Sequence, residues 1–164
     1  MNWITRRLAL GPHPDRKAAD KLLAMGITHT LNVGSTRCNY DEPKRFVGTT
    51  WHEIVDLQRI PEASVRFCLE SLFKTLTEDP GSKVYVHCAA GQNRSPNILW
   101  LFLIACGMPA RDAELLITER TLDAVPNHRR LVDDELVEYA RAHGTTCMRP
   151  VPERTLDAAQ SSDP

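Results

Sequence analysis

Hydrophobic residues follow two different spacings along this chain, and the spacing changes from one segment to the next. In residues 27–33 apolar and polar positions alternate, which is the period of a β-strand. In residues 16–25 alanine and leucine return at helical spacing, after Asp15 and before Gly26. Asp15 is expected to cap this helix, and Gly26 to end it in a left-handed conformation. The alternation predicts strands interleaved with helices.

The same two patterns continue through most of the chain. Strands are expected at residues 4–10, 27–33, 51–55 and 83–87. Helices are expected at residues 16–25, 61–76, 98–106 (preceded by Pro96 in a first turn), 110–120 and 127–143. Residues 34–50 hold Gly, Ser, Asn, Asp, Pro and several charges, which predicts a surface connection with little regular structure.

The most apolar segments indicate how these elements are layered. Residues 83–87 contain an almost continuous apolar run, typical of a central strand covered on both faces. Strands alternating with helices then predict an α/β fold, with a central, mostly parallel sheet of four to five strands flanked by helices. We expect one domain over residues 1–144, with Gly144 ending the last helix. Residues 145–164 are rich in Pro, Ser, Asp, Gln and Ala, so we expect a flexible C-terminal tail there.

Size and charge limit the classes of function. A chain of 164 residues suits one compact domain. Its 20 Lys and Arg residues nearly balance 21 Asp and Glu residues, which predicts no nucleic-acid partner and no attraction to a membrane surface. The N-terminus lacks a signal-peptide core and no apolar run approaches the length of a membrane span, so we expect a cytoplasmic protein. We also expect a monomer.

The cysteine content also favours a cytoplasmic location. Their number, five, is odd and their spacing is unpaired, which favours a reducing compartment over a disulfide framework. No Cys-x-x-Cys or His-x3-His pairing occurs, so we expect no metal and no cofactor. Cys68 and Cys106 fall on apolar helix faces and are expected to pack in the core, with a disulfide to an oxidised Cys88 as the alternative. Cys38 and Cys147 are expected to be exposed and incidental.

The segment VYVHCAAGQNRSP, from Val84 to Pro96, carries the clearest chemistry in the chain. It joins a buried strand to a helix through a short loop, and loop amides at a helix N-terminus favour a bound anion such as phosphate. Cys88 begins the loop, where the same positive potential favours the nucleophilic thiolate. Arg94 follows, with a planar guanidinium that suits two phosphoryl oxygens. Gly91 permits the turn between them.

The motif His-Cys-x5-Arg-Ser, here HCAAGQNRS, resembles the active-site signature of the protein tyrosine and dual-specificity phosphatases. The resemblance extends from about Gly26 to Gly144 and is strongest to the small, atypical dual-specificity branch. It implies a dual-specificity phosphatase-like fold. It also implies a substrate-binding loop formed by Ala89, Ala90, Gly91, Gln92, Asn93 and Arg94. In that branch an upstream aspartate acts as general acid, which matches Asp56 in Glu-Ile-Val-Asp-Leu, with Glu62 as the alternative.

The resemblance implies a metal-independent mechanism in two steps. Cys88 attacks phosphorus while Asp56 protonates the leaving oxygen, and the cysteinyl-phosphate is then hydrolysed by water with Asp56 as base. Ser95 is expected to donate a hydrogen bond to the departing thiolate. His87 is expected to orient the loop and the thiolate by hydrogen bonds, and Asn32 to brace the same loop.

The loop composition bears on the substrate. Apart from Arg94 the loop carries no positive charge, whereas phosphoinositide-selective relatives often place lysines there. This favours phosphoprotein or phosphopeptide substrates carrying phosphotyrosine, with phosphoserine and phosphothreonine left open. The alternatives are a phosphate on a small molecule, a phosphoinositide or an RNA 5′ end, a phosphoprotein-binding module without turnover, and a rhodanese-like sulfur carrier.

Overall fold

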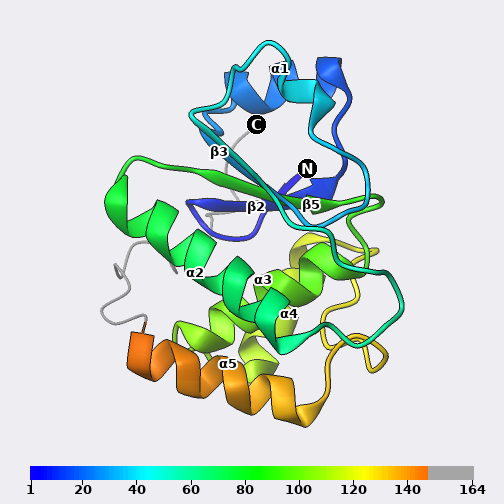
Figure 1. Cartoon of the computed structure of the whole chain (residues 1–164), viewed down its shortest axis with the longest axis vertical. Helices are drawn as coiled ribbons and strands as arrows, with labels where there is room; N and C mark the ends of the chain where they lie inside the picture. Colours follow the sequence, from blue (N-terminus) through cyan, green and yellow to red (C-terminus); the bar gives the residue numbers. More distant parts are fainter. Residues whose placement is uncertain (148–164) are drawn as a thin grey trace.

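The computed structural model describes residues 1–147. Its strands form one five-stranded sheet in the order β1-β2-β5-β3-β4 (Figure 1). These strands are β1 (Asn2–Trp3), β2 (Leu8–Pro12), β3 (His29–Asn32), β4 (Gly48–Trp51) and β5 (Val84–Cys88). Every neighbouring pair is parallel except β1 with β2. The expected α/β fold with a central, mostly parallel sheet is therefore confirmed.

Helices cover both faces of this sheet. They are α1 (Arg16–Ala24), the short 3-10 helix η1 (Asn39–Asp41), α2 (Glu62–Glu78), α3 (Arg94–Ala105), α4 (Ala110–Arg120) and α5 (Asp134–Cys147). Figure 1 shows α1 on one side of the sheet and the other four α-helices on the opposite side. As predicted, the Asp15 carboxylate caps α1, and Gly26 follows this helix with a φ of +84°.

The central strand β5 and the helix α3 form the axis of the molecule. Strand β5 pairs with β2 on one side and β3 on the other, and all five of its residues are buried. All twelve residues of α3 are buried as well, because α2, α4 and α5 surround it. The loop from Cys88 to Arg94 therefore joins the two most enclosed elements of the fold.

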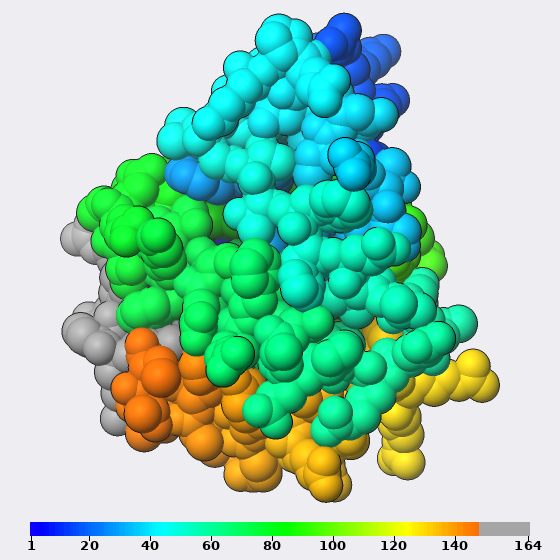
Figure 2. Space-filling view, viewed as in Figure 1, coloured from blue at the N-terminus to red at the C-terminus, as the bar shows by residue number. Residues whose placement is uncertain are grey.

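The sheet separates two apolar clusters. The larger fills the space between the sheet and α2–α5 and includes Val84, Val86 and Cys88. The smaller lies toward α1 and η1 and includes Tyr85 and Tyr40. Successive side chains of β5 thus enter different layers, as the period of a strand requires. In the space-filling view the cyan to teal segment between β3 and α2 spreads over the front of the molecule (Figure 2).

Both edges of the sheet differ from the prediction. The strand expected at residues 4–10 is wrong in its bounds, because the chain turns at Thr5, whose hydroxyl accepts hydrogen bonds from the amides of Arg7 and Leu8. Strand β1 precedes this turn and β2 follows it. The strand expected at residues 51–55 is instead β4, which ends at Trp51. As a partly exposed edge strand it lacks the apolar alternation that marks interior strands.

The last helix begins and ends later than the predicted residues 127–143. The Asp133 carboxylate accepts a hydrogen bond from an amide in the first turn of α5 and so fixes its start. Gly144 does not end the helix. It lies inside α5, where a Cβ would come within 1.9 Å of the Ala105 carbonyl oxygen. The expected domain end therefore falls within a helix, and residues 148–164 of the expected tail lie outside the described residues.

Gly144→Ala is expected to lower the free energy of unfolding by about 1–3 kcal/mol, because overpacking against α3 outweighs the helix preference of alanine, about 1 kcal/mol. Urea unfolding followed by circular dichroism measures this. Gly81→Ala is the control, since its Cβ would meet only the Asp79 carboxylate, at 3.4 Å. Unchanged stability of Gly144→Ala would contradict the close packing of α5 on α3.

Candidate active site

The loop from Cys88 to Arg94 is held against the end of β2. Gly91 adopts a φ of +75°, and a Cβ at this position would lie 2.5 Å from the Gly11 carbonyl carbon. Only glycine meets both demands. The His13 amide donates a hydrogen bond to the Ala89 carbonyl at 3.0 Å. The predicted turn at Gly91 is thus also a point of contact between two segments of main chain.

Cys88 and Ser95 lie together at the two ends of this loop. The Cys88 side chain is only 2% exposed, and the Ser95 hydroxyl donates a hydrogen bond to its sulfur at 3.3 Å. Ser95 is itself fully buried in the first turn of α3. A buried hydroxyl that donates to sulfur stabilises negative charge on it. The contact therefore suits a cysteine that acts as nucleophile and leaving group.

Arg94 is the buried cation of the site, with 6% of its surface exposed. Its Nη1 donates to the Ile54 carbonyl oxygen at 3.2 Å and to the Ser35 hydroxyl at 3.4 Å. Its Nη2 lies 3.7 Å from the Asp56 carboxylate. Its buried Nε has no hydrogen-bond partner among the described residues. An unpaired donor on a buried guanidinium favours the binding of an anion.

The structure brings Asp56 to the same loop, 40% exposed on the side chain. Its Oδ1 accepts hydrogen bonds from the Leu57 amide at 3.0 Å and from the Asn93 side chain at 3.4 Å. Leu57 has a φ of +56°, an uncommon conformation for a residue with a Cβ, which turns the chain at this point. The alternative acid, Glu62, acts electrostatically on Arg59 and Tyr139 instead. Of the two candidate carboxylates, Asp56 is the one that contacts the loop, through Asn93 and Arg94.

His87 faces the layer of α1, away from the large core. It is fully buried, and its Nε2 shares a hydrogen bond of 2.7 Å with the Tyr40 hydroxyl, which also donates to Thr30 at 3.1 Å. Tyr85 stacks on the imidazole. Burial, assisted by the nearby His13, lowers the pKa of His87 to about 3, and the Cys88 backbone opposes this shift. A neutral imidazole suits the expected orienting role.

Asn32 braces a different segment from the one expected. Its side chain donates to the Thr36 carbonyl at 2.6 Å and accepts from the Gly34 amide at 2.8 Å, so it shapes the loop after β3. A Cβ on Gly34 would lie 3.2 Å from the Ala89 amide nitrogen. The hydrogen bonds of Asn32 thus go to the 34–36 segment. Because this segment packs against the Cys88 loop, Asn32 supports that loop indirectly.

Two residues of the site were missed by sequence reasoning. Tyr40 lies in the segment predicted as surface connection, yet it is buried against His87. Asn97, fully buried in α3, donates to the carbonyls of Asn93 at 2.7 Å and Val125 at 2.8 Å. Nothing local marks Tyr40. A polar residue in the otherwise apolar run after Pro96 was the available signal for Asn97.

The loop positions between Cys88 and Arg94 are small or neutral. Ala89, Ala90 and Gln92 are exposed, and Asn93 is half-buried. The Gln92 carbonyl accepts a hydrogen bond from the Val125 amide at 2.8 Å, which ties the loop to the connection between α4 and α5. Arg94 is thus the one charged side chain within the loop. Its neighbours leave an open approach over the two alanines.

The other four cysteines differ in their surroundings. Burial raises the pKa of the Cys68 and Cys106 thiols to about 12, as fits their expected place in the core. Cys38 differs from the expectation of an exposed residue, since it is half-buried and its sulfur accepts a hydrogen bond from Asn32. Cys147 is exposed, as expected. All five cysteines are free thiols.

Residues 1–147 contain no group of three or more His, Cys, Asp and Glu side chains placed to hold a metal ion. No helix in this part of the chain is both long and apolar enough to cross a membrane. The residues at the loop instead supply a thiol, a guanidinium, a carboxylate and a hydroxyl around one space. This set can bind a phosphoryl group, attack it and exchange a proton with its leaving group.

The chain is similar to known proteins over most of its length. Residues 1–138 match the family model described as Swiss Army Knife protein, DSP-PTPase phosphatase domain. The chain is 28% identical over 109 residues to dual specificity protein phosphatase 13B of Mus musculus, covering 63% of this chain and 55% of that protein. It is 45% identical over 51 residues to protein tyrosine phosphatase type IVA 2 of Mus musculus, covering 30% of each. The matches thus span about half the length of the first relative and less than a third of the second.

Solved structures show the same fold. The crystal structure of PTPMT1 has a TM-score of 0.70 at 17% identity, covering 88% of this chain and 95% of that one. PTPMT1 in complex with PI(5)P has a TM-score of 0.66 at 16% identity, with 87% and 93% covered. The human tyrosine phosphatase-like serine/threonine/tyrosine-interacting protein has a TM-score of 0.69 at 23% identity, with 88% and 95% covered.

Buried His87 makes the stability of the fold depend on pH in a defined direction. Its pKa is lowered to about 3 from an ordinary value of 6.5. Below pH 6.5 the unfolded chain therefore binds a proton that the native state does not, and stability falls as the pH drops toward 3. The expected loss is up to about 1.4 kcal/mol per pH unit as the pH falls from 6.5 to 3, and His87 adds no pH dependence above 6.5 or below 3.

Urea unfolding at several pH values between 7.5 and 4.5 tests this dependence. His87→Gln is the comparison, since it keeps a polar side chain without the titrating ring. We expect the variant to be less stable at pH 7.5 but to lose less stability on acidification than the unmodified protein. Parallel curves for the two proteins would show that His87 is not the buried neutral group described.

Proposed function

The chain belongs to the family of Swiss Army Knife proteins with a DSP-PTPase phosphatase domain, and from this premise we propose that it is a cysteine-dependent phosphatase. It hydrolyses phosphate monoesters on phosphoproteins through a cysteinyl-phosphate intermediate, without a metal. One observation carries the proposal: Cys88, the buried Arg94 with its unpaired Nε, and Asp56 are all held by one loop.

The first step transfers the phosphoryl group to sulfur. The phosphate enters the loop and binds the Arg94 guanidinium and the loop amides, loosening the ion pair of 3.7 Å between Arg94 and Asp56. The Cys88 sulfur attacks phosphorus in line with the leaving oxygen. Asp56, released from Arg94 and carrying a proton taken up from solvent, gives that proton to the leaving oxygen as its bond to phosphorus breaks.

The second step returns the enzyme to its starting state. Water attacks phosphorus on the face that the leaving group has vacated, and Asp56, now ionised, takes its proton. The sulfur–phosphorus bond breaks and the electron pair returns to Cys88. The Ser95 hydroxyl, 3.3 Å from that sulfur, stabilises the thiolate as it leaves. Inorganic phosphate is released.

Apolar side chains beside the loop favour an aromatic phosphoester. Leu57, next to the proposed acid, is 47% exposed. Val125, whose amide bonds to the Gln92 carbonyl, is 45% exposed. Exposed apolar groups on two sides of a phosphate site suit contact with the ring of phosphotyrosine. Phosphotyrosine is therefore the proposed main substrate, with phosphoserine and phosphothreonine as further ones.

Two alternatives have a specific observation in their favour. PTPMT1, which shares the fold, has been seen with PI(5)P, so a phosphoinositide is the second candidate substrate. Against it stands a loop whose other positions are alanine, glycine, glutamine and asparagine. Another protein of this fold is named as a tyrosine phosphatase-like, serine/threonine/tyrosine-interacting protein. The name suggests the second alternative, a module that binds phosphoproteins without turnover. The presence of Cys88, Arg94 and Asp56 together favours turnover.

Cys88→Ser is expected to abolish hydrolysis of para-nitrophenyl phosphate, assayed with reductant and without added metal. Asp56→Asn is expected to lower kcat by about 10²–10⁴-fold, because the leaving oxygen loses its proton donor. Glu62→Gln makes the same carboxylate-to-amide change away from the loop and should leave kcat unchanged. If Glu62→Gln lost activity and Asp56→Asn kept it, the assignment of the acid would be reversed.

Matched peptides that differ in phosphotyrosine or phosphoserine test the apolar rim. Leu57→Ala is expected to reduce kcat/KM about three- to tenfold for phosphotyrosine, since ring contact is lost, with a smaller effect on phosphoserine. Val47→Ala is the control, because Val47 is also exposed but lies directly before β4, outside the rim of the loop. Vesicles with PI(5)P form a third substrate, and faster turnover of this lipid than of either peptide would favour the second candidate.

A further inference from the structure

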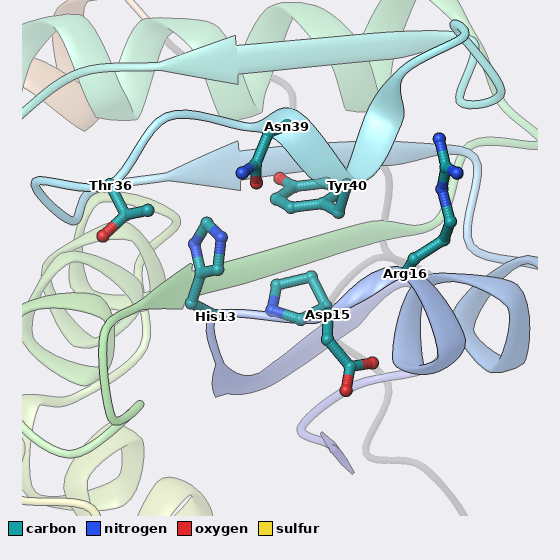
Figure 3. Close-up of a pocket in the computed structure, with 7 residues that line it drawn as sticks. His13, Asp15, Arg16, Thr36, Asn39 and Tyr40 are labelled. Atoms are coloured by element: carbon teal, nitrogen blue, oxygen red, sulfur yellow. The ribbon is translucent and has the colours of Figure 1, made fainter.

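A hollow of about 410 Å³ opens beside the candidate active site (Figure 3). It is lined by His13, Pro14, Asp15, Arg16, Thr36, Asn39 and Tyr40. These residues come from the start of α1 and from the loop between β3 and η1, two segments far apart in the sequence. Its volume is in the usual range of small-ligand sites. The hollow has no role in the reaction proposed for Cys88, Arg94 and Asp56.

Both walls of the hollow touch the phosphate-binding loop at the same residue. On one side the His13 amide donates to the Ala89 carbonyl at 3.0 Å. On the other side lies the 34–36 segment, where a Cβ on Gly34 would be 3.2 Å from the Ala89 amide nitrogen. Ala89 and Ala90 are exposed and have the smallest side chains that carry a Cβ. A substrate with its phosphate in the loop can therefore extend over these alanines into the hollow.

The acidic groups nearest the hollow are already engaged. The Asp15 carboxylate accepts the Ala18 amide at 2.7 Å as the cap of α1, and in Figure 3 it points away from Thr36 and Asn39. Asp41 is buried and accepts from two backbone amides and a threonine hydroxyl. Asp20 pairs with Arg45. Each of these carboxylates has a partner within the fold, and Asp15, which also lines the hollow, keeps its charge as the cap of α1.

Each of the remaining polar groups can donate a hydrogen bond. Arg16 donates to the backbone carbonyl of Glu42, and no carboxylate of the described residues lies within ion-pair distance of its guanidinium. Thr36 and Asn39 present a hydroxyl and an amide from exposed positions. The His13 ring points into the space between them in Figure 3. The hollow therefore combines one cation that has no carboxylate partner with three neutral groups able to hydrogen-bond, of which His13 and Asn39 also bond to each other.

We propose that this hollow is a specificity site for the carboxylate of an acidic residue close to the phosphorylated residue of a peptide substrate. Arg16 supplies the charge, and Thr36, Asn39 and His13 supply hydrogen bonds. Tyr40 forms an apolar wall, because its hydroxyl is occupied by His87 and Thr30. The inference rests on the proposed phosphatase function and names the sequence context that this site selects.

Phosphotyrosine peptides carrying Glu or Gln at each position within two residues of the phosphotyrosine test the proposal. At one position we expect Glu to raise kcat/KM roughly three- to tenfold over Gln, with the difference shrinking as salt is added. Arg16→Gln should abolish this difference. Arg16→Glu should reverse the charge preference, so that a peptide with Lys at that position is hydrolysed faster than the Glu peptide. Lys17→Gln, which removes the same charge from the next residue of α1, is the matched control and should keep the preference.

Two further measurements separate failure of this proposal from failure of the proposed function. Hydrolysis of para-nitrophenyl phosphate, which is too small to reach the hollow, should be equal in the unmodified protein and in Arg16→Gln. Peptide affinity of Cys88→Ser reports the Glu preference without turnover. A preference that is absent from both kinetics and affinity, or that survives Arg16→Gln, would overturn the specificity site. A gain only with a second phosphate in place of Glu would overturn the choice of a carboxylate.

Discussion

The close contact of main chain between the Cys88–Arg94 loop and the end of β2 sets the geometry on which the rest of the site depends. Gly91 lies so near Gly11 that no side chain fits between them, and the Ala89 carbonyl is held by the amide of His13. These contacts fix the loop in front of the start of α3 before any ligand binds. The cost of ordering that loop is met during folding and not during binding, which is the condition for electrostatic catalysis.

Burial gives the charged groups of this space their character. Arg94 is enclosed by the Ile54 carbonyl, the Ser35 hydroxyl and the Asp56 carboxylate, and it keeps one donor unpaired. These three contacts hold the guanidinium in place, and the unpaired Nε remains available to an anion. A dianionic phosphate competes for the same cation and thereby frees Asp56 for its proposed role. Anion binding and proton transfer are in this view coupled through one arginine.

The sheet keeps this chemistry apart from a second polar network. His87 and Tyr40 lie on the α1 side of β5, while the sulfur of Cys88 lies on the side of α3. The neutral imidazole holds the strand end from behind without adding a charge beside the thiol. The same α1 side carries the hollow next to Ala89. Support for the loop and the proposed selection of the peptide thus come from one layer of the molecule.

The sequence by itself determined the elements whose signals are local. The apolar run of β5, the capped α1 and the periodic α2, α3 and α4 lie close to where they were expected, as does the loop with Cys88, Gly91 and Arg94. Edge strands and the ends of α5 were misplaced, because their bounds depend on partners and not on their own pattern. Gly144 reads as a helix stop, yet close packing against Ala105 is what requires glycine there.

Only the tertiary structure decided which distant residues complete the site. Asp56 was assigned by resemblance, but its contacts with Asn93 and Arg94 span more than 35 positions of sequence. The partners of Tyr40 and Asn97 could not be read from the sequence, since both residues hydrogen-bond to segments far along the chain. The hollow beside Ala89 likewise exists only where two loops meet. Local pattern fixes the conformation of each segment, whereas the proximity of remote side chains arises from packing.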